Sequence, residues 1–228
     1  MGSGSHAPVT PLFNSLLVAF AAVALATPFA IGAGWLMARR DFPGKSVLHM
    51  VLLSPLVLPP VVTGYLLLSA LGRNSFIGAL GQGWFGVDLS FNLVGAVIAA
   101  MVVGFPLYVA GVQIAIERVP HELEEMAAIA GASPWQVFRK VTLPVAGSGI
   151  GAGCLLAFAR AMGEFGATVV LAGNLQGEQS TLALAIYDAM DDPGSDQQVI
   201  NLTLFSILAS FLVLVLYERL IHQKARSH

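Results

Sequence analysis

Five long apolar stretches constrain the fold of this chain more than any other feature of its sequence. A transmembrane helix needs about 20 mostly apolar residues, and each stretch is of that order or longer. Only 11% of the residues are charged, whereas soluble domains carry roughly 25%. The sequence therefore predicts an all-α membrane protein with about five transmembrane helices. The expected spans are Leu12–Met37, Ser46–Leu71, Asn92–Ile116, Leu143–Ala172 and Val199–Tyr217.

Two of these spans contain residues that disturb a helix. Three prolines, Pro55, Pro59 and Pro60, must bend the second span, because proline lacks a backbone donor and clashes with the preceding turn. Arg160 and Glu164 interrupt the fourth span. They are four residues apart, so they can pair across one helical turn.

The positions of Lys and Arg predict the orientation. If the chain crosses the membrane five times, nine of its eleven basic residues lie on one side. Basic residues accumulate on the cytoplasmic side, so we expect an N-terminus outside and a C-terminus in the cytoplasm. The nine residues are Arg39, Arg40, Lys45, Arg118, Arg139, Lys140, Arg219, Lys224 and Arg226.

A charged segment, Glu124–Pro144, separates the third and fourth spans and predicts two short helices. Its first helix has an apolar face at i, i+3, i+4 and i+7, formed by Leu123, Met126, Ala127 and Ala130. Gly131 is suited to end that helix. Ser133, Pro134 and Gln136 have the spacing of a capping box with proline at the first helical position. By the charge pattern the pair faces the cytoplasm. A helix lying flat on the membrane is the alternative, which the glutamates disfavour at an anionic surface.

This segment resembles the coupling helix of the integral-membrane permeases of ABC importers. The family pattern is Glu-Ala-Ala, three residues, Gly, nine residues, Ile, one residue and Leu; here Met126 replaces the first Ala and Val141 the Ile. The resemblance implies the type I ABC importer permease fold, with a segment at residues 121–142 that docks on a separate ATPase subunit. It assigns this coupling role to Glu122, Glu124, Glu125, Met126, Ala127, Ala130, Gly131, Ala132, Ser133, Pro134, Trp135, Phe138, Leu143 and Pro144.

A second resemblance concerns the substrate. Leu156–Tyr187 contains "FAR", "GEFGAT", "GN" and "TLALAIY" in the order found in the molybdate branch of these permeases, and "FPGKS" at Phe42–Ser46 also fits. The resemblance implies import of an oxyanion, with molybdate favoured over tungstate, sulfate or thiosulfate. It also implies a location in the bacterial inner membrane and a periplasmic oxyanion-binding protein as a partner.

No Walker A motif occurs in the chain, so we expect no ATPase activity of its own. ATP and Mg²⁺ would bind to two copies of a cytoplasmic ATPase partner, and no cofactor to this chain. Cys154 is the only cysteine, which excludes a cysteine metal site. The net charge of −2 and the lack of a basic cluster do not indicate a nucleic-acid partner. We expect one transmembrane domain at residues 11–221, a tail at 222–228, and an N-terminal tail at 1–10 that includes a possible cloning remnant.

Several polar residues within the spans are candidates for the translocation path or its gate. Arg160 and Glu164 form either a structural brace beside Gly163 and Gly166 or a gate. Uncharged hydroxyls suit a path that must release what it binds. Thr63, Ser69, Ser148 and Thr168 are such candidates, with helix packing as the alternative role. Because five spans do not readily enclose a pore, we expect a homodimer with the path on its two-fold axis.

Two regions between the spans, Gly72–Phe91 and Gly173–Gln198, are predicted to be loops. The second contains Asp188, Asp191 and Asp192. Clustered aspartates bind Mg²⁺ in some enzymes, so a membrane enzyme is the distant alternative. A purely structural membrane subunit is another. An ATPase that co-purifies with the chain would distinguish a permease from both.

Overall fold

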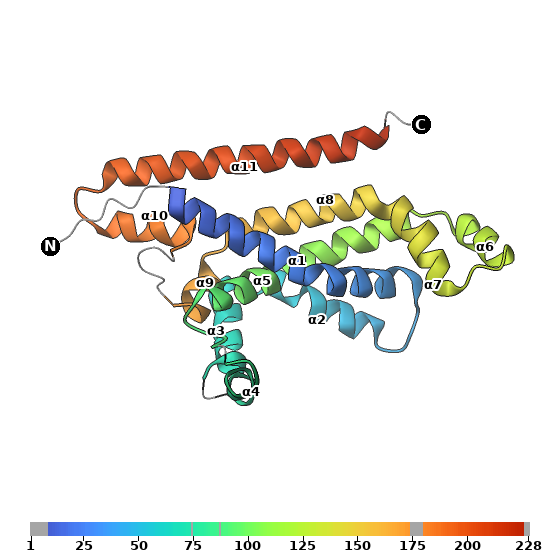
Figure 1. The fold of residues 1–228 in the computed structure, drawn as a ribbon, viewed down its shortest axis with the longest axis horizontal. Coiled ribbons are helices and arrows are strands. Elements are labelled where there is room, and N and C mark those ends of the chain that lie inside the picture. The colour runs from blue at the N-terminus through green and yellow to red at the C-terminus, as the bar shows by residue number, and fades with distance from the viewer. Residues whose placement is uncertain (1–8, 74, 87, 174–179, 226–228) are drawn as a thin grey trace.

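Three packed helices form the centre of the fold, two of them parallel and the third antiparallel to both, and a fourth lies beside them (Figure 1). The computed structural model describes residues 9–73, 75–86, 88–173 and 180–225. Within them every regular element is a helix. The three central helices are α1 (Val9–Arg39), α5 (Leu93–Glu117) and α8 (Leu143–Met162), and the fourth is α11 (Asp196–Ala225). Small residues such as Ala22, Ala26, Ala96 and Ala157 form much of the buried core, which permits close packing of the backbones.

Four of the five predicted spans are confirmed as long helices, and the remaining one corresponds to a bent pair of shorter helices. In the described residues four helices are long and apolar enough to cross a membrane, and a fifth span results if the pair α2 (Lys45–Val57) and α3 (Pro60–Leu71) is counted as one. The chain bends by 114° between the two members of the pair. Pro60 begins α3, and Leu58 before the two prolines is extended, as expected for a residue that precedes proline.

The fourth predicted span is also broken. Helix α8 ends at Met162, and the short α9 (Gly166–Leu171) follows after Gly163, Glu164 and Phe165. Helix α9 packs against α3, so the two broken spans meet. A Cβ atom on Gly64 would lie 2.8 Å from the Ala167 Cα, so the α3–α9 contact requires glycine at this position.

The two predicted loops contain helices. Gly72–Phe91 includes α4 (Phe76–Phe85), which begins where the Ser75 hydroxyl accepts a hydrogen bond of 2.9 Å from the Gly78 N–H. Gly173–Gln198 includes α10 (Leu182–Asp191), whose apolar side packs against α1 and α11. The prediction of loops was wrong because it relied on glycine and charge content and overlooked these short amphipathic patterns. Residues 74, 87 and 174–179 of these regions lie outside the described residues.

The predicted topology places the α6 segment and the α10 segment on opposite sides of the membrane, with one span between them. Helix α6 (His121–Ile129) lies at one end and α10 at the other (Figure 1). Glu124 and Asp191 are therefore separated by the length of the bundle, as the five-span topology requires.

The glycine-rich start of α8 serves packing within the chain. A Cβ on Gly149 would lie 2.6 Å from the Ala115 Cβ, and one on Gly153 would lie 3.2 Å from the Gly111 Cα. These residues bring α8 against α5. Gly147 makes no such close approach, because a Cβ atom at this position would have nothing within 4 Å.

Candidate functional site

Helix α6 is a short, capped helix at one end of the bundle. Glu122 and Glu124 lie in its first turn, where the helix dipole favours negative charge. At its other end the Ala132 N–H donates to the Ala127 carbonyl at 3.0 Å and the Gly131 N–H to the Ala128 carbonyl at 2.9 Å. These two bonds form a Schellman motif. Gly131 has φ of 90°, a conformation that favours glycine.

The second helix of the pair, α7 (Pro134–Val137), begins with the predicted capping box. The Ser133 hydroxyl accepts from the Gln136 N–H at 3.4 Å, and the Gln136 side chain accepts from the Ser133 N–H at 2.8 Å. Helix α7 then continues through a π-helical turn, η1 (Phe138–Thr142), into α8. Pro144 explains this turn, because proline has no N–H for an α-helical bond and clashes with the carbonyl four residues earlier. Movement of α7 is thereby linked directly to a membrane span.

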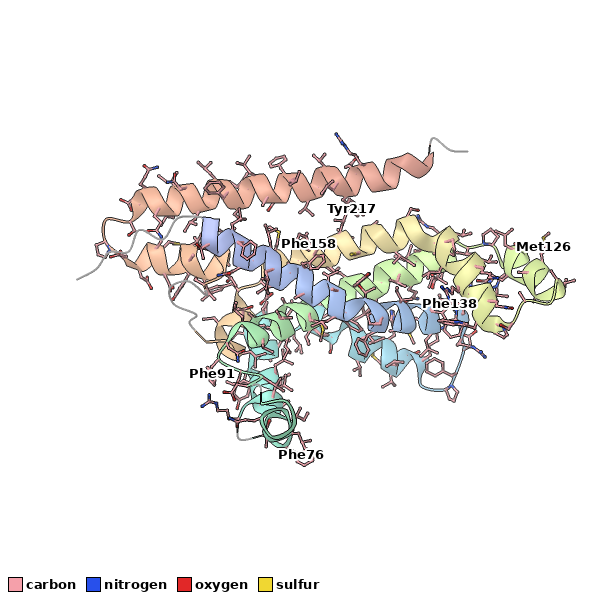
Figure 2. The ribbon with its side chains drawn as sticks, in the orientation of Figure 1. Phe76, Phe91, Met126, Phe138, Phe158 and Tyr217 are labelled. Carbon is pink, nitrogen blue, oxygen red and sulfur yellow. The ribbon has the colours of Figure 1, made fainter. Side chains whose placement is uncertain are left out.

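Four large apolar side chains are exposed on this helix pair. We name this set the apolar ridge: Leu123, Met126, Ile129 and Trp135, with exposed fractions of 42, 66, 87 and 66%. The first three follow at intervals of three residues, which makes them neighbours on one side of a helix. Figure 2 shows Met126 at the far end of the molecule. Exposed apolar groups of this size, rimmed by charge, are typical of an interaction surface.

Ile129 lies outside the apolar face predicted from the sequence, which contains Ala127 and Ala130. The interval of three residues from Met126 would have identified it. Of the predicted coupling residues other than those of the ridge, most are exposed: Glu122, Glu125, Ala130, Gly131, Ser133, Pro134 and Pro144. The half-buried ones are Glu124, Ala127, Ala132, Phe138 and Leu143.

Glu124 points toward the bundle, unlike its neighbour Glu125. Its Oε2 atom lies 3.1 Å from Arg39 Nε, in an ion pair that lacks the alignment of a hydrogen bond. Arg39 Nη2 donates to Glu124 Oε1 at 3.3 Å and to the Val119 carbonyl at 2.9 Å. The Thr142 hydroxyl donates to Glu124 Oε1. Glu124 is therefore joined to the last residue of α1 and to the π-helical turn before α8.

Aromatic contacts join the start of η1 to the end of α1. The rings of Trp35 and Phe138 meet edge to face at 6.1 Å, and Trp135 lies 5.5 Å from Phe138. The Arg40 guanidinium lies 5.7 Å from the Trp35 ring centre. At the same end the Lys45 ammonium donates to Asp41 at 2.8 Å, and this bond lowers the pKa of the exposed Asp41 carboxyl.

Arg160 and Glu164 pair as predicted, at the break between α8 and α9. Arg160 Nη1 donates to Glu164 Oε2 at 2.6 Å, and the Glu164 side chain is 2% exposed. The other oxygen, Glu164 Oε1, accepts from the Ala167 N–H at 2.7 Å. This carboxylate therefore accepts a backbone N–H from the first turn of α9, and its charge balances that of Arg160. The geometry favours the brace over the gate.

The four hydroxyl candidates are distributed over α3, α8 and α9. Thr63 and Thr168 are buried, on α3 and α9. Ser69 is exposed, and its hydroxyl donates to the Tyr65 carbonyl at 2.9 Å. Ser148 lines a groove of about 640 Å³ between α5, α8 and α11. Tyr217 lines it from α11, on the side that faces α8 (Figure 2).

The aspartates of α10 were the basis of the membrane-enzyme alternative. Among the described residues no group of three His, Cys, Asp or Glu side chains is placed to hold a metal ion. On another segment, next to α4, Arg73 pairs with Asp88, and Nε donates at 3.1 Å. This pair raises the pKa of Arg73.

The chain matches a known protein family over most of its length. The family described as "Binding-protein-dependent transport system inner membrane component" matches residues 30–226. The chain belongs to this family. A chain of the methionine ABC transporter MetNI superposes on it with a TM-score of 0.70 over 94% of both chains at 17% identity. A bacterial alginate ABC transporter superposes with a TM-score of 0.67. The fold is therefore that of an ABC importer permease.

Curated members of the family resemble the chain along most of its length. "Molybdenum transport system permease protein ModB" of Haemophilus influenzae is 46% identical over 90% of this chain and 89% of its own. The protein of the same name in Escherichia coli K12 is 45% identical over the same shares. "Sulfate transport system permease protein CysW" of Synechocystis is 34% identical over 92% of this chain and 77% of its own. The proteins that this chain resembles thus include permeases named for molybdenum transport and for sulfate transport.

Proposed function

We propose that this chain is the membrane permease subunit of an ATP-driven importer that moves molybdate from the periplasm to the cytoplasm. The observation that carries the proposal is the 46% identity to a molybdenum transport permease over 90% of this chain. The sulfate permease relative, at 34% identity, favours sulfate as the second candidate substrate. Tungstate and thiosulfate share the chemistry of a tetrahedral or near-tetrahedral oxyanion.

The helix pair α6–α7 is the surface on which an ATPase subunit would dock. Its rigid caps lower the cost of binding, since ordering a flexible segment costs about 1–2 kcal/mol per residue. Its apolar ridge would be buried on binding, and the charges of the surrounding glutamates would orient the partner. ATP and Mg²⁺ would bind to two copies of that partner, and this chain would hold no cofactor. With basic residues gathered at the α6 end, this end faces the cytoplasm in the proposed orientation.

The transport path would form between two copies of the chain. A homodimer with a two-fold axis lets five spans per copy enclose a pore, and a periplasmic binding protein would deliver the anion at the α10 end. Glu164 is an unsuitable anion ligand, because its carboxylate would repel the substrate and both its oxygens are engaged. Ser148, which lines the groove between α5, α8 and α11, is the best-placed hydroxyl candidate for a role in the path.

The substrate is tested by reconstituting the permease with its ATPase and its binding protein in liposomes. We expect ATP-dependent uptake of labelled molybdate that unlabelled tungstate inhibits strongly and sulfate weakly. Because the binding protein would select the anion before it reaches the permease, its affinities for the three anions are measured in parallel. Uptake of sulfate in preference to molybdate would assign the second candidate substrate. Failure of the ATPase to co-purify with the permease would refute the importer assignment itself.

Replacement of Gly131 should weaken the ATPase contact without disturbing the spans. A side chain in the left-handed conformation costs roughly 1–2 kcal/mol, and nothing lies within 4 Å of a Cβ built at Gly131. The effect of Gly131→Val therefore comes from backbone strain alone. We expect ATPase binding about 5–30-fold weaker, since 1.4 kcal/mol is a factor of ten. Gly131→Asn is the matched control, because asparagine adopts this conformation more readily; equal losses in both variants would contradict the backbone explanation.

A further inference from the structure

Helix α6 is attached to the rest of the molecule in an unusual way. None of its residues is buried, so hydrophobic packing does not hold it against the spans. Its large apolar side chains, Leu123, Met126 and Ile129, are exposed instead. The side chain that turns inward is Glu124, whose exposed fraction is 17%. The attachment of α6 therefore depends on polar contacts rather than on a core: those of Glu124, and a contact of 3.3 Å between His121 Nε2 and Arg39 Nη1.

The contact of Glu124 involves three parts of the chain. Arg39, the last residue of α1, lies 3.1 Å away through Nε, and its exposed fraction is 8%. Thr142, which is 1% exposed, donates its hydroxyl proton to the same carboxylate from the turn that leads into α8. Arg39 also donates to the Val119 carbonyl at 2.9 Å, directly after α5. We name this set, Arg39, Val119, Glu124 and Thr142, the Glu124 junction.

Charge and burial make the junction stiff. A hydrogen bond between charged groups is roughly twice as strong as a neutral one, and partial burial reduces its screening by salt. In exposed ion pairs, long side chains exchange partners freely. Here the Glu124 carboxylate also accepts from the Thr142 hydroxyl, and the Arg39 guanidinium also donates to the Val119 carbonyl. A displacement of α6 is therefore passed to α1 and α8 together, and it cannot be absorbed by a change of rotamer without breaking several bonds.

We infer that Arg39 is a positioning residue for coupling: it holds Glu124 so that movement of α6 on the ATPase is transmitted to the ends of α1 and α8. The inference rests on the proposed function, because it assumes that an ATPase moves α6. It goes further by separating two tasks within the segment. The apolar ridge binds the partner, and the Glu124 junction conveys its motion to the membrane spans.

The test measures the number of ATP molecules hydrolysed per molybdate imported by the reconstituted full complex. Arg39→Met removes the charge but keeps an unbranched side chain and leaves the ridge untouched. We expect ATPase binding within about twofold of wild type and a rise of at least about fivefold in ATP consumed per anion. Arg39→Lys, which keeps the charge but not the forked geometry, should restore part of the coupling. Arg39→Met combined with Glu124→Gln should be no worse than Glu124→Gln alone, because both disable one junction.

Lys45→Met is the matched control. Lys45 pairs with Asp41 at the same end of the bundle, so the variant also loses one positive charge and one ion pair, but it does not touch α6. Its ATP consumption per anion should equal that of wild type. A wild-type ratio for Arg39→Met would overturn the inference. So would a loss of ATPase binding that matches the loss of uptake, because Arg39 would then only maintain the docking surface. A wild-type complex that binds its ATPase but transports no oxyanion would instead refute the proposed function.

Discussion

Ile129→Asp is expected to abolish stable association with the ATPase while the permease still inserts and purifies normally. Ile129 is 87% exposed, so the substitution removes no internal packing. At the centre of an interface, however, an unpaired carboxylate would replace a buried apolar contact. Substitutions at such positions cost 2 kcal/mol or more, which corresponds to at least about a 30-fold loss of affinity. Molybdate uptake should fall to the background of liposomes that lack ATP.

Ile129→Met is the matched control for this experiment. It keeps an apolar side chain of similar size, and methionine adapts to irregular contacts. Association and uptake should stay within a few-fold of wild type. Pull-down of the ATPase with each purified variant, followed by uptake in liposomes, measures both effects. Wild-type association of Ile129→Asp would exclude the apolar ridge as the docking surface.

Removal of one member of the Arg160–Glu164 pair should destabilise the protein far more than removal of both charges. A lone charge at membrane depth costs about 2.5–3.5 kcal/mol on insertion scales. Arg160→Met leaves the carboxylate of Glu164, whose side chain is 2% exposed, without its partner. Glu164→Gln leaves Arg160, which is 29% exposed. We therefore expect Arg160→Met to be the more damaging single change.

The double variant Arg160→Met/Glu164→Gln should recover most of the stability. The glutamine oxygen can still accept from the Ala167 N–H, so the first turn of α9 stays satisfied. Arg160→Met/Glu164→Leu is the control that lacks this acceptor, and it should lose about 1–3 kcal/mol more. Thermal unfolding in detergent ranks the variants. If Glu164→Gln leaves stability unchanged but abolishes uptake, the pair is a gate and not a brace.

Local features of this protein were predictable from its sequence because they depend on neighbouring residues. The capping box of Ser133 and Gln136 and the turn at Gly131 follow from backbone geometry at fixed spacings. The bend at Pro59 and Pro60 follows from a missing donor. The Arg160–Glu164 pair was visible because the two residues are one helical turn apart. Helices α4 and α10 were missed because short amphipathic patterns give a weak signal in a chain that is apolar throughout.

The choice between Glu124 and Glu125 could not be made from the sequence. Both lie in the same helix and have the same side chain, and only the rotation of α6 about its axis turns one toward Arg39 and the other toward solvent. Arg39 and Glu124 are 85 residues apart in the chain, so no local pattern relates them. The same holds for Gly64 and Ala167, where two broken spans meet.

The amino-acid sequence by itself determined that the chain spans a membrane, how many spans it has and which segment leaves the bundle. These properties follow from the free energy of burying each residue type in lipid and from the dihedral preferences of glycine and proline. Only the tertiary structure decided which polar groups on different spans contact one another. Such contacts depend on the rotation and depth of whole helices, which are set by the packing of small residues such as Gly149 and Gly153 of α8 against Ala115 and Gly111 of α5.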